Sequence, residues 1–166
     1  MIVEVGHYAL VLAFALSLAQ TALGLWSGRR GDLALMQATS GAAVIGFSLV
    51  ALAFLALANA YVASDFSVSN VYQNSHTLKP MIFKISGIWG NHEGSLLLWV
   101  LVLAFFAALV AVLGRDLPPS LRATTLAEQG LIAAAFLLFL LVTSSPFARL
   151  DPAPFQGGSL NPLLQD

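Results

Sequence analysis

The chain has 166 residues, of which 58% are hydrophobic and 9% are charged, and its formal net charge is −1. A soluble domain carries roughly 25% charged residues. The composition therefore excludes a water-soluble globule, a disordered chain and a nucleic-acid-binding protein, which would need a basic face. What remains is a membrane protein, and the length allows about four spans of ~20 residues.

Four stretches without charged residues predict the membrane spans, because a lone segment in lipid satisfies its backbone groups only as a helix. We expect transmembrane helices at about 5–26, 38–63, 92–114 and 123–144. The fold class is therefore an all-α membrane protein, with residues 1–144 as a four-helix transmembrane module. Gln20 and Asn59 lie within spans, and we expect their amides to make hydrogen bonds between helices.

Arginines mark the two short connections between the expected spans. Arg29 and Arg30 follow the first span, and Arg115 and Arg122 lie between the third and fourth. Because basic residues concentrate in cytoplasmic loops, these connections are expected on the cytoplasmic side. Both ends of the chain and the longer middle loop, near residues 64–91, are then expected on the outer side.

The middle loop contains two local patterns. Residues 66–70 alternate apolar and polar side chains, which predicts an extended segment. Pro80 suits the first position of a helix. The residues after it that share one helical face are Met81, Ile82, Ile85, Ile88 and Trp89. This pattern predicts either a short interfacial helix with its apolar face in lipid or protein, or an N-terminal extension of the third span.

The third span opens with the sequence Trp-Gly-Asn-His-Glu-Gly-Ser at residues 89–95. Asn91 is a suitable N-cap, and Glu93 in the first turn suits the positive end of the helix dipole. Neither role explains His92, which is either an interfacial histidine with satisfied hydrogen bonds or a residue with a direct chemical role. The candidate residues for a site or a partner contact at the outer surface are Trp89, Gly90, Asn91, His92, Glu93, Gly94 and Trp99.

Several kinds of site have no counterpart in the sequence. It has no cysteine, no Gly-rich phosphate loop, no His-Glu-x-x-His pair and no Gly-x-Ser-x-Gly elbow. The three histidines, His7, His76 and His92, are scattered. We therefore predict no catalytic residue and no metal ligand in this chain. The expected spans also lack a charged residue near mid-membrane, where an ion path normally needs one.

Five segments are distinctive enough to indicate a family. They are Glu4–Tyr8, Asn74–Thr77, Lys84–Trp99, Phe136–Phe147 and Leu160–Asp166. With these segments in this order, the chain resembles the N-terminal part of the CcmF family, the haem lyase subunits of cytochrome c maturation, together with the related NrfE proteins. The most specific of the segments is Lys84–Trp99.

The resemblance implies haem chemistry on the periplasmic side of a bacterial inner (cytoplasmic) membrane. In the family, haem is taken from a CcmE-like haem chaperone and joined by thioether bonds to the Cys-x-x-Cys-His motif of apocytochrome c. The cofactors implied for the full assembly are a b-type haem and the substrate haem. The implied partners are the remainder of the haem lyase, CcmH/CcmI-like subunits that deliver apocytochrome c, and membrane lipid.

The sequence departs from the family in one important respect. The family's Trp-rich periplasmic segment and its haem-ligating histidines have no match in these residues. We therefore expect a fragment of a longer haem lyase, an incomplete reading frame or one product of a split gene, and we expect that it does not catalyse alone. Residues 145–166 form an outer-face Pro/Gly-containing tail. Its residues expected to lead toward the haem site and a missing C-terminal part are Asn161, Pro162, Gln165 and Asp166.

Two other functions are compatible with the residues alone. One is a non-catalytic structural or assembly subunit of another membrane complex, and the other is an ion- or quinone-transport subunit. The empty mid-membrane disfavours the second of these.

The missing ligands lead to a spectroscopic prediction. The purified chain, incubated with haem, should show no stoichiometric six-coordinate b-type spectrum, because no family haem ligand falls on any of its positions. Optical absorption spectroscopy of the oxidised and reduced protein checks this. A clear six-coordinate spectrum would refute the prediction and would make His7, His76 and His92 the first ligands to test.

Overall fold

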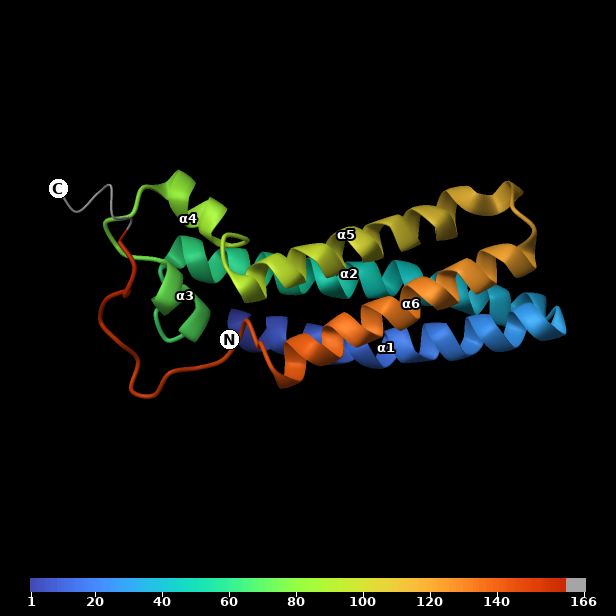
Figure 1. Cartoon of the computed structure of the whole chain (residues 1–166), viewed down its shortest axis with the longest axis horizontal. Coiled ribbons are helices and arrows are strands. Elements are labelled where there is room, and N and C mark those ends of the chain that lie inside the picture. Colours follow the sequence, from blue (N-terminus) through green and yellow to red (C-terminus); the bar gives the residue numbers. More distant parts are fainter. Residues whose placement is uncertain (161–166) are drawn as a thin grey trace.

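The long helices of the computed structural model, which describes residues 1–160, form an antiparallel four-helix bundle (Figure 1). They are α1 (Ile2–Arg30), α2 (Leu33–Ala63), α5 (His92–Leu113) and α6 (Pro119–Val142). All four are long and apolar enough to cross a membrane by length and composition. The all-α membrane fold expected from the sequence is thus confirmed.

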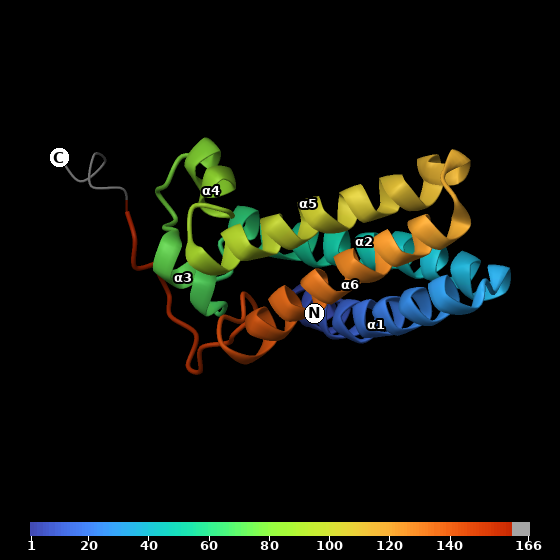
Figure 2. The same ribbon diagram turned by 45° about the vertical axis from the view of Figure 1, so that its right-hand side comes forward.

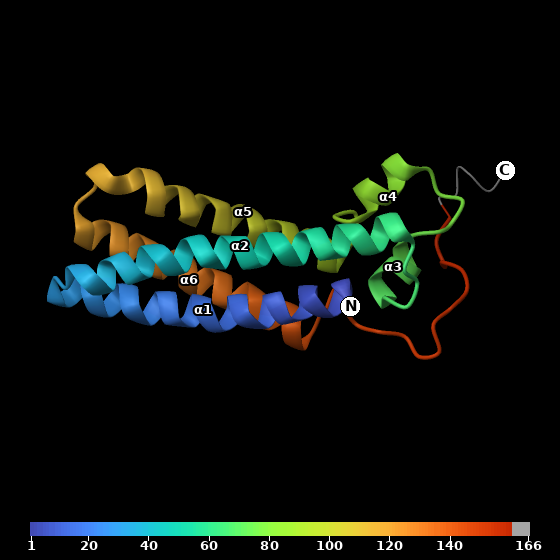
Figure 3. The same ribbon diagram turned by 180° about the vertical axis from the view of Figure 1, so that it is seen from behind.

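Each long helix packs on two main neighbours. α1 and α5 each lie between α2 and α6, so they occupy opposite corners of the bundle, as the front and back views in Figures 1 and 3 show. The short connections gather at one end, called here the arginine end, which carries Arg29, Arg30, Arg115 and Arg122. The other end, called the loop end, carries the N-terminus and residues 64–91 and 143–160.

Local capping signals set where the long helices stop. Gly31 has the left-handed φ of 70° and its N–H reaches the Ser27 carbonyl, which ends α1. Asp32 then caps α2 by accepting from two backbone N–H groups. α6 begins at Pro119, earlier than the expected residue 123, because proline suits the first turn of a helix. α1, α2 and α6 therefore begin before the expected residues 5, 38 and 123.

Glycines let the backbone of α1 approach its neighbours closely. A Cβ atom added to Gly24 would lie 2.6 Å from the Ala123 carbonyl oxygen and 2.7 Å from the Ala127 Cβ of α6. A Cβ atom on Gly6 would lie 2.6 Å from the Phe147 ring and 2.8 Å from the Ala56 Cβ of α2. Close contact of this kind drives helix association in lipid, where burial of apolar surface adds little.

Two polar side chains of α1 join it to α6. The Gln20 amide donates to the Leu126 carbonyl at 2.7 Å, and the Thr21 hydroxyl lies 3.2 Å from the Ala127 carbonyl. The hydrogen bond expected for Gln20 is confirmed. The expectation for Asn59 is wrong, because its side chain is exposed at the bundle surface instead of facing another helix.

The middle loop folds into two short helices, α3 (Ser69–Asn74) and α4 (Met81–Gly87). The extended segment expected at residues 66–70 is wrong: only Val68 forms an isolated bridge, with Arg149, and a helix starts directly after it. α4 follows Pro80, and residues 88–91 separate it from α5. It is thus a helix of its own and not an extension of α5, as Figure 2 shows.

The tail after α6 crosses the loop end. Backbone hydrogen bonds connect Ser69 to Ala148, Leu150 to Ser67, and Gly158 to Tyr72, with N···O distances of 2.7–2.8 Å. Gly157 lies so close to the Ser75 carbonyl that a side chain would overlap it. These contacts hold the described part of the tail against α3. The predicted tail residues Asn161, Pro162, Gln165 and Asp166 lie outside the described residues.

A pair of Gly→Ala variants tests the close packing of α1. Both positions are inside helices, so both gain about 1 kcal/mol of helix propensity. Gly41→Ala points into open space and should keep that gain. Gly24→Ala meets α6 and should lose about 1–3 kcal/mol through overpacking. Thermal unfolding in detergent, followed by circular dichroism, measures both. Equal midpoints would contradict the close contact.

Candidate functional site

The side chains of the predicted segment at residues 89–95 point in two different directions at the loop end. Asn91, Glu93 and Gly94 are half-buried or buried and face the bundle, whereas His92 is exposed on the outside of α5. Neighbouring residues on a helix do not share a face. The structure therefore divides the predicted site into an inward half and an outward half, which have different chemistry.

The inward half belongs to a cluster of four polar side chains, called here the asparagine cluster: Tyr61, Asn70, Asn91 and Glu93. The Tyr61 hydroxyl donates to Asn70 Oδ1 at 2.7 Å. Asn70 Nδ2 donates to Asn91 Oδ1 at 2.7 Å and to Glu93 Oε2 at 3.0 Å. The cluster therefore joins α2, α3 and α5 through hydrogen bonds between side chains.

Asn91 also shapes the start of α5. Its Oδ1 accepts from the Gly94 N–H at 2.8 Å, which confirms the N-cap expected from the sequence. Its Nδ2 donates to the Tyr61 hydroxyl at 3.0 Å and to the Gly87 carbonyl of α4 at 2.8 Å. Gly94 lies so close to the Ile88 carbonyl that a side chain would overlap it. These inward residues are thus explained by folding alone.

The outward half lines a shallow groove between α5 and α6. The His92 ring lies 6.0 Å, centroid to centroid, from the Phe139 ring in an edge-on arrangement. The groove has a volume of about 390 Å³, and its other lining residues are Leu96, Ala135 and Phe136. Trp99 follows His92 by seven residues, so the two share a helical face, and its side chain is 68% exposed.

Trp89 and Gly90 lie between α4 and α5, away from the groove. Trp89 is 42% exposed, and its carbonyl accepts a hydrogen bond of 2.6 Å from the Ser95 hydroxyl. The Gly90 N–H reaches the Ser86 carbonyl at 3.0 Å. The structure therefore does not unite all seven predicted residues into one pocket.

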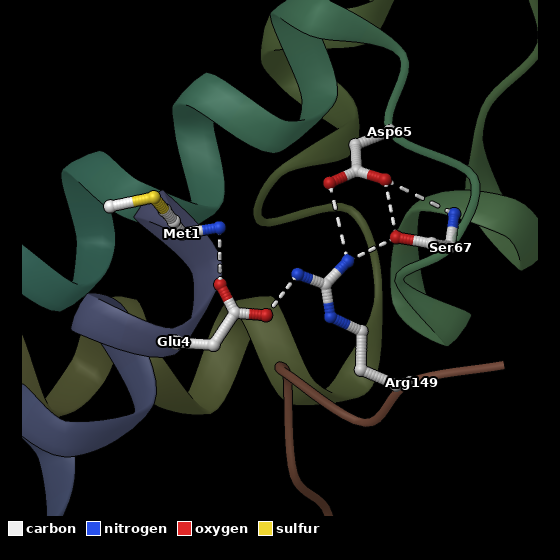
Figure 4. A network of polar contacts seen from close by, with 5 residues as sticks. All are labelled: Met1, Glu4, Asp65, Ser67 and Arg149. Atoms are coloured by element: carbon white, nitrogen blue, oxygen red, sulfur yellow. Dashed lines mark hydrogen bonds and ion pairs between the residues drawn. The ribbon is translucent and has the colours of Figure 1, made fainter.

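A second polar cluster, which was not predicted from the sequence, is centred on Arg149 and shown in Figure 4. The Arg149 guanidinium contacts the Glu4 carboxylate, Asp65 and the Ser67 hydroxyl. Glu4 also pairs with the N-terminal amine at 2.5 Å. The cluster joins the start of α1, the loop after α2 and the tail. The charged side chains are 36–46% exposed, so each pair contributes little alone.

The three histidines lie in separate surroundings. His7 lines a cavity of about 260 Å³ with Glu4 and Arg149, whereas the ring of His76 accepts the Leu78 N–H within its own loop. His92 lies in the groove beside α6. Among the described residues, no group of three His, Cys, Asp or Glu side chains could hold a metal ion.

The chain is similar in sequence to a known protein family and to proteins of several bacteria. A family model described as "Cytochrome C assembly protein" matches residues 89–166. The cytochrome c-type biogenesis protein CycK of Rhizobium meliloti is 58% identical over 166 residues, covering 100% of this chain and 25% of that protein. The corresponding protein CcmF of Pseudomonas aeruginosa is 47% identical over 167 residues and is likewise covered to 25%.

A solved structure gives the same result for the fold. The chain called "Cytochrome c Heme Lyase CcmF" superposes with a TM-score of 0.83 at 28% identity, over 89% of this chain and 25% of that one. The chain thus spans about a quarter of the length of the relatives that it matches.

Matched variants test the asparagine cluster. Asn70→Ala should lower the free energy of unfolding by about 1–3 kcal/mol, because it removes the side-chain acceptor of the buried Tyr61 hydroxyl and the side-chain donor to the Glu93 carboxylate. Gln73→Ala in the same short helix removes only an exposed hydrogen bond and should change little. Thermal unfolding in detergent compares the two. If both variants had the same unfolding midpoint as the wild type, the asparagine cluster would not contribute the expected stability.

Proposed function

Since the chain belongs to the CcmF family of cytochrome c-type biogenesis proteins, we propose that it is the N-terminal membrane module of a cytochrome c haem lyase. The observation that carries this proposal is the similarity along the whole chain, combined with a fold that matches the haem lyase structure. The module supports haem handling and covalent haem attachment to apocytochrome c, and the chemistry itself belongs to the complete protein.

The proposed task of the module is to hold the loop end in a fixed shape. The asparagine cluster ties α3, α4 and α5 to the end of α2, and Arg149 ties the tail to α1. His92 and Trp99 then stand on a supported face of α5, where they can meet haem or another part of the lyase. Rigid support of this kind is what positioning residues require.

The described residues do not fit a six-coordinate haem by themselves. The groove beside α5 offers one imidazole, and the residues that face it are apolar. His7 and His76 lie in other surroundings. The proposed haem groups, a b-type haem and the substrate haem, are therefore assigned to ligands in the remainder of the lyase.

The proposed location is the bacterial inner membrane, with the loop end on the periplasmic side. The four arginines at the opposite end support this orientation, because basic residues favour the cytoplasmic side. The proposed partners meet the module at the loop end. They are the remainder of the haem lyase, a CcmE-like haem chaperone and CcmH/CcmI-like subunits that deliver apocytochrome c.

Two histidine variants in the complete protein test this role. His92→Ala should lower the yield of mature cytochrome c about tenfold, which corresponds to losing an interaction of about 1.4 kcal/mol. His76→Ala should leave the yield close to wild type, because its ring only accepts a hydrogen bond within its own loop.

The measurement is haem staining of cytochrome c in cells that carry each variant at equal membrane levels. Normal maturation in both variants would return His92 to an interfacial role without chemistry. Equal loss in both would show that the loop end as a whole, and not His92, is required.

A further inference from the structure

α4 presents three faces with different chemistry. One face turns to the bundle, where Lys84 and Ile88 are buried and the Lys84 ammonium donates to Ser64 Oγ at 2.7 Å at the end of α2. A second face is exposed and apolar. A third lines a polar pocket. Figures 1 and 2 show α4 at the side of the loop end, next to the last turns of α2.

The exposed residues of α4 and of the chain just before and after it form an apolar patch, called here the α4 patch: Leu78, Met81, Ile82, Ile85 and Trp89. Two of its members, Leu78 and Ile82, are more than 70% exposed. A group of exposed apolar side chains of this kind marks contact with a membrane or a protein. An amphipathic helix with its apolar face in the acyl boundary and a tryptophan at headgroup depth has this arrangement.

The adjoining face lines a pocket of about 310 Å³, called here the Lys79 pocket. Its polar lining comes from Asn74, Lys79, Ser86 and Ser159, and Gly87 and Gly90 open their backbone to it. The Lys79 ammonium is held by the Asn74 carbonyl at 2.9 Å. Burial lowers the pKa of Lys79, so an anion beside it would favour the charged form.

The charge of this region is one-sided. Between Asp65 and Glu93 the sequence has no acidic residue, but it has Lys79 and Lys84. No carboxylate lines the Lys79 pocket in the described part of the chain. A basic pocket beside an apolar surface at the bundle end complements an anionic headgroup joined to acyl chains.

We propose that the α4 patch and the Lys79 pocket together bind one anionic phospholipid. The lipid phosphate lies against the Lys79 ammonium and the polar lining of the pocket, and the acyl chains run along the α4 patch. The bound lipid fixes the depth of α4 in the outer interface. This inference goes beyond the haem lyase role and does not depend on it.

Quenching of Trp89 fluorescence tests the proposal in the 166-residue chain. The variants Trp26→Phe and Trp99→Phe are combined, so that Trp89 is the remaining tryptophan. The protein is reconstituted into phosphatidylcholine vesicles that contain brominated phosphatidylglycerol or brominated phosphatidylcholine. The anionic lipid should show about fivefold higher relative affinity, the effect expected from one lysine near an anionic surface.

Charge variants identify the source of the preference. Lys79→Gln should abolish the preference for phosphatidylglycerol, and Lys79→Arg should keep it. Arg122→Gln, which removes one cation at the arginine end, should leave it unchanged. Circular dichroism at equal helix content confirms that each variant is folded.

Three results would overturn the proposal. Equal quenching by both brominated lipids would show that the pocket does not select a headgroup. Absence of quenching by either lipid would show that the α4 patch does not contact lipid. Loss of the preference on adding inorganic phosphate would show that the pocket takes a free phosphate and not a lipid.

Discussion

Close backbone contact between α1 and its two neighbours is the constraint on which the rest of the bundle depends. Surrounding lipid is as apolar as leucine, so the helices gain little by hiding apolar side chains from it. Gly24 lets α1 reach α6, and Gly6 brings its start against α2 and Phe147. Gln20 adds a hydrogen bond to the same contact. α1 therefore fixes the positions of α2 and α6 beside it. The loop end is built on these helices.

The loop end faces a different requirement, because its irregular backbone lies beside apolar helices and must find partners for its polar groups. The Asn70 side chain supplies such partners. Its carbonyl oxygen accepts from Tyr61, and its amide donates to Asn91 and Glu93. Arg149 performs the same function for the tail. Side-chain networks of this kind are stable only when each member is satisfied, so they favour one arrangement of the loop end over others.

Features with a local cause were predictable from the sequence. Charge-free windows located the four long helices, Pro80 with its apolar spacing located α4, and Asn91 identified a helix cap. Long-range contacts were not predictable: Arg149 meets Glu4 across 145 positions of sequence, with no local signal at either residue. The prediction of an extended segment at residues 66–70 was wrong for a physical reason. Alternation over five residues is a weak signal, and without a longer partner strand the backbone satisfies itself better as helix α3.

The two halves of the segment at residues 89–95 have different explanations because a helix separates neighbours by about 100°. Glu93 faces Asn70, so its position is accounted for by the fold. His92, one residue earlier, faces a groove of apolar and aromatic side chains that do not require a histidine. The inward half thus fixes the start of α5 and, through it, the direction in which the His92 imidazole points.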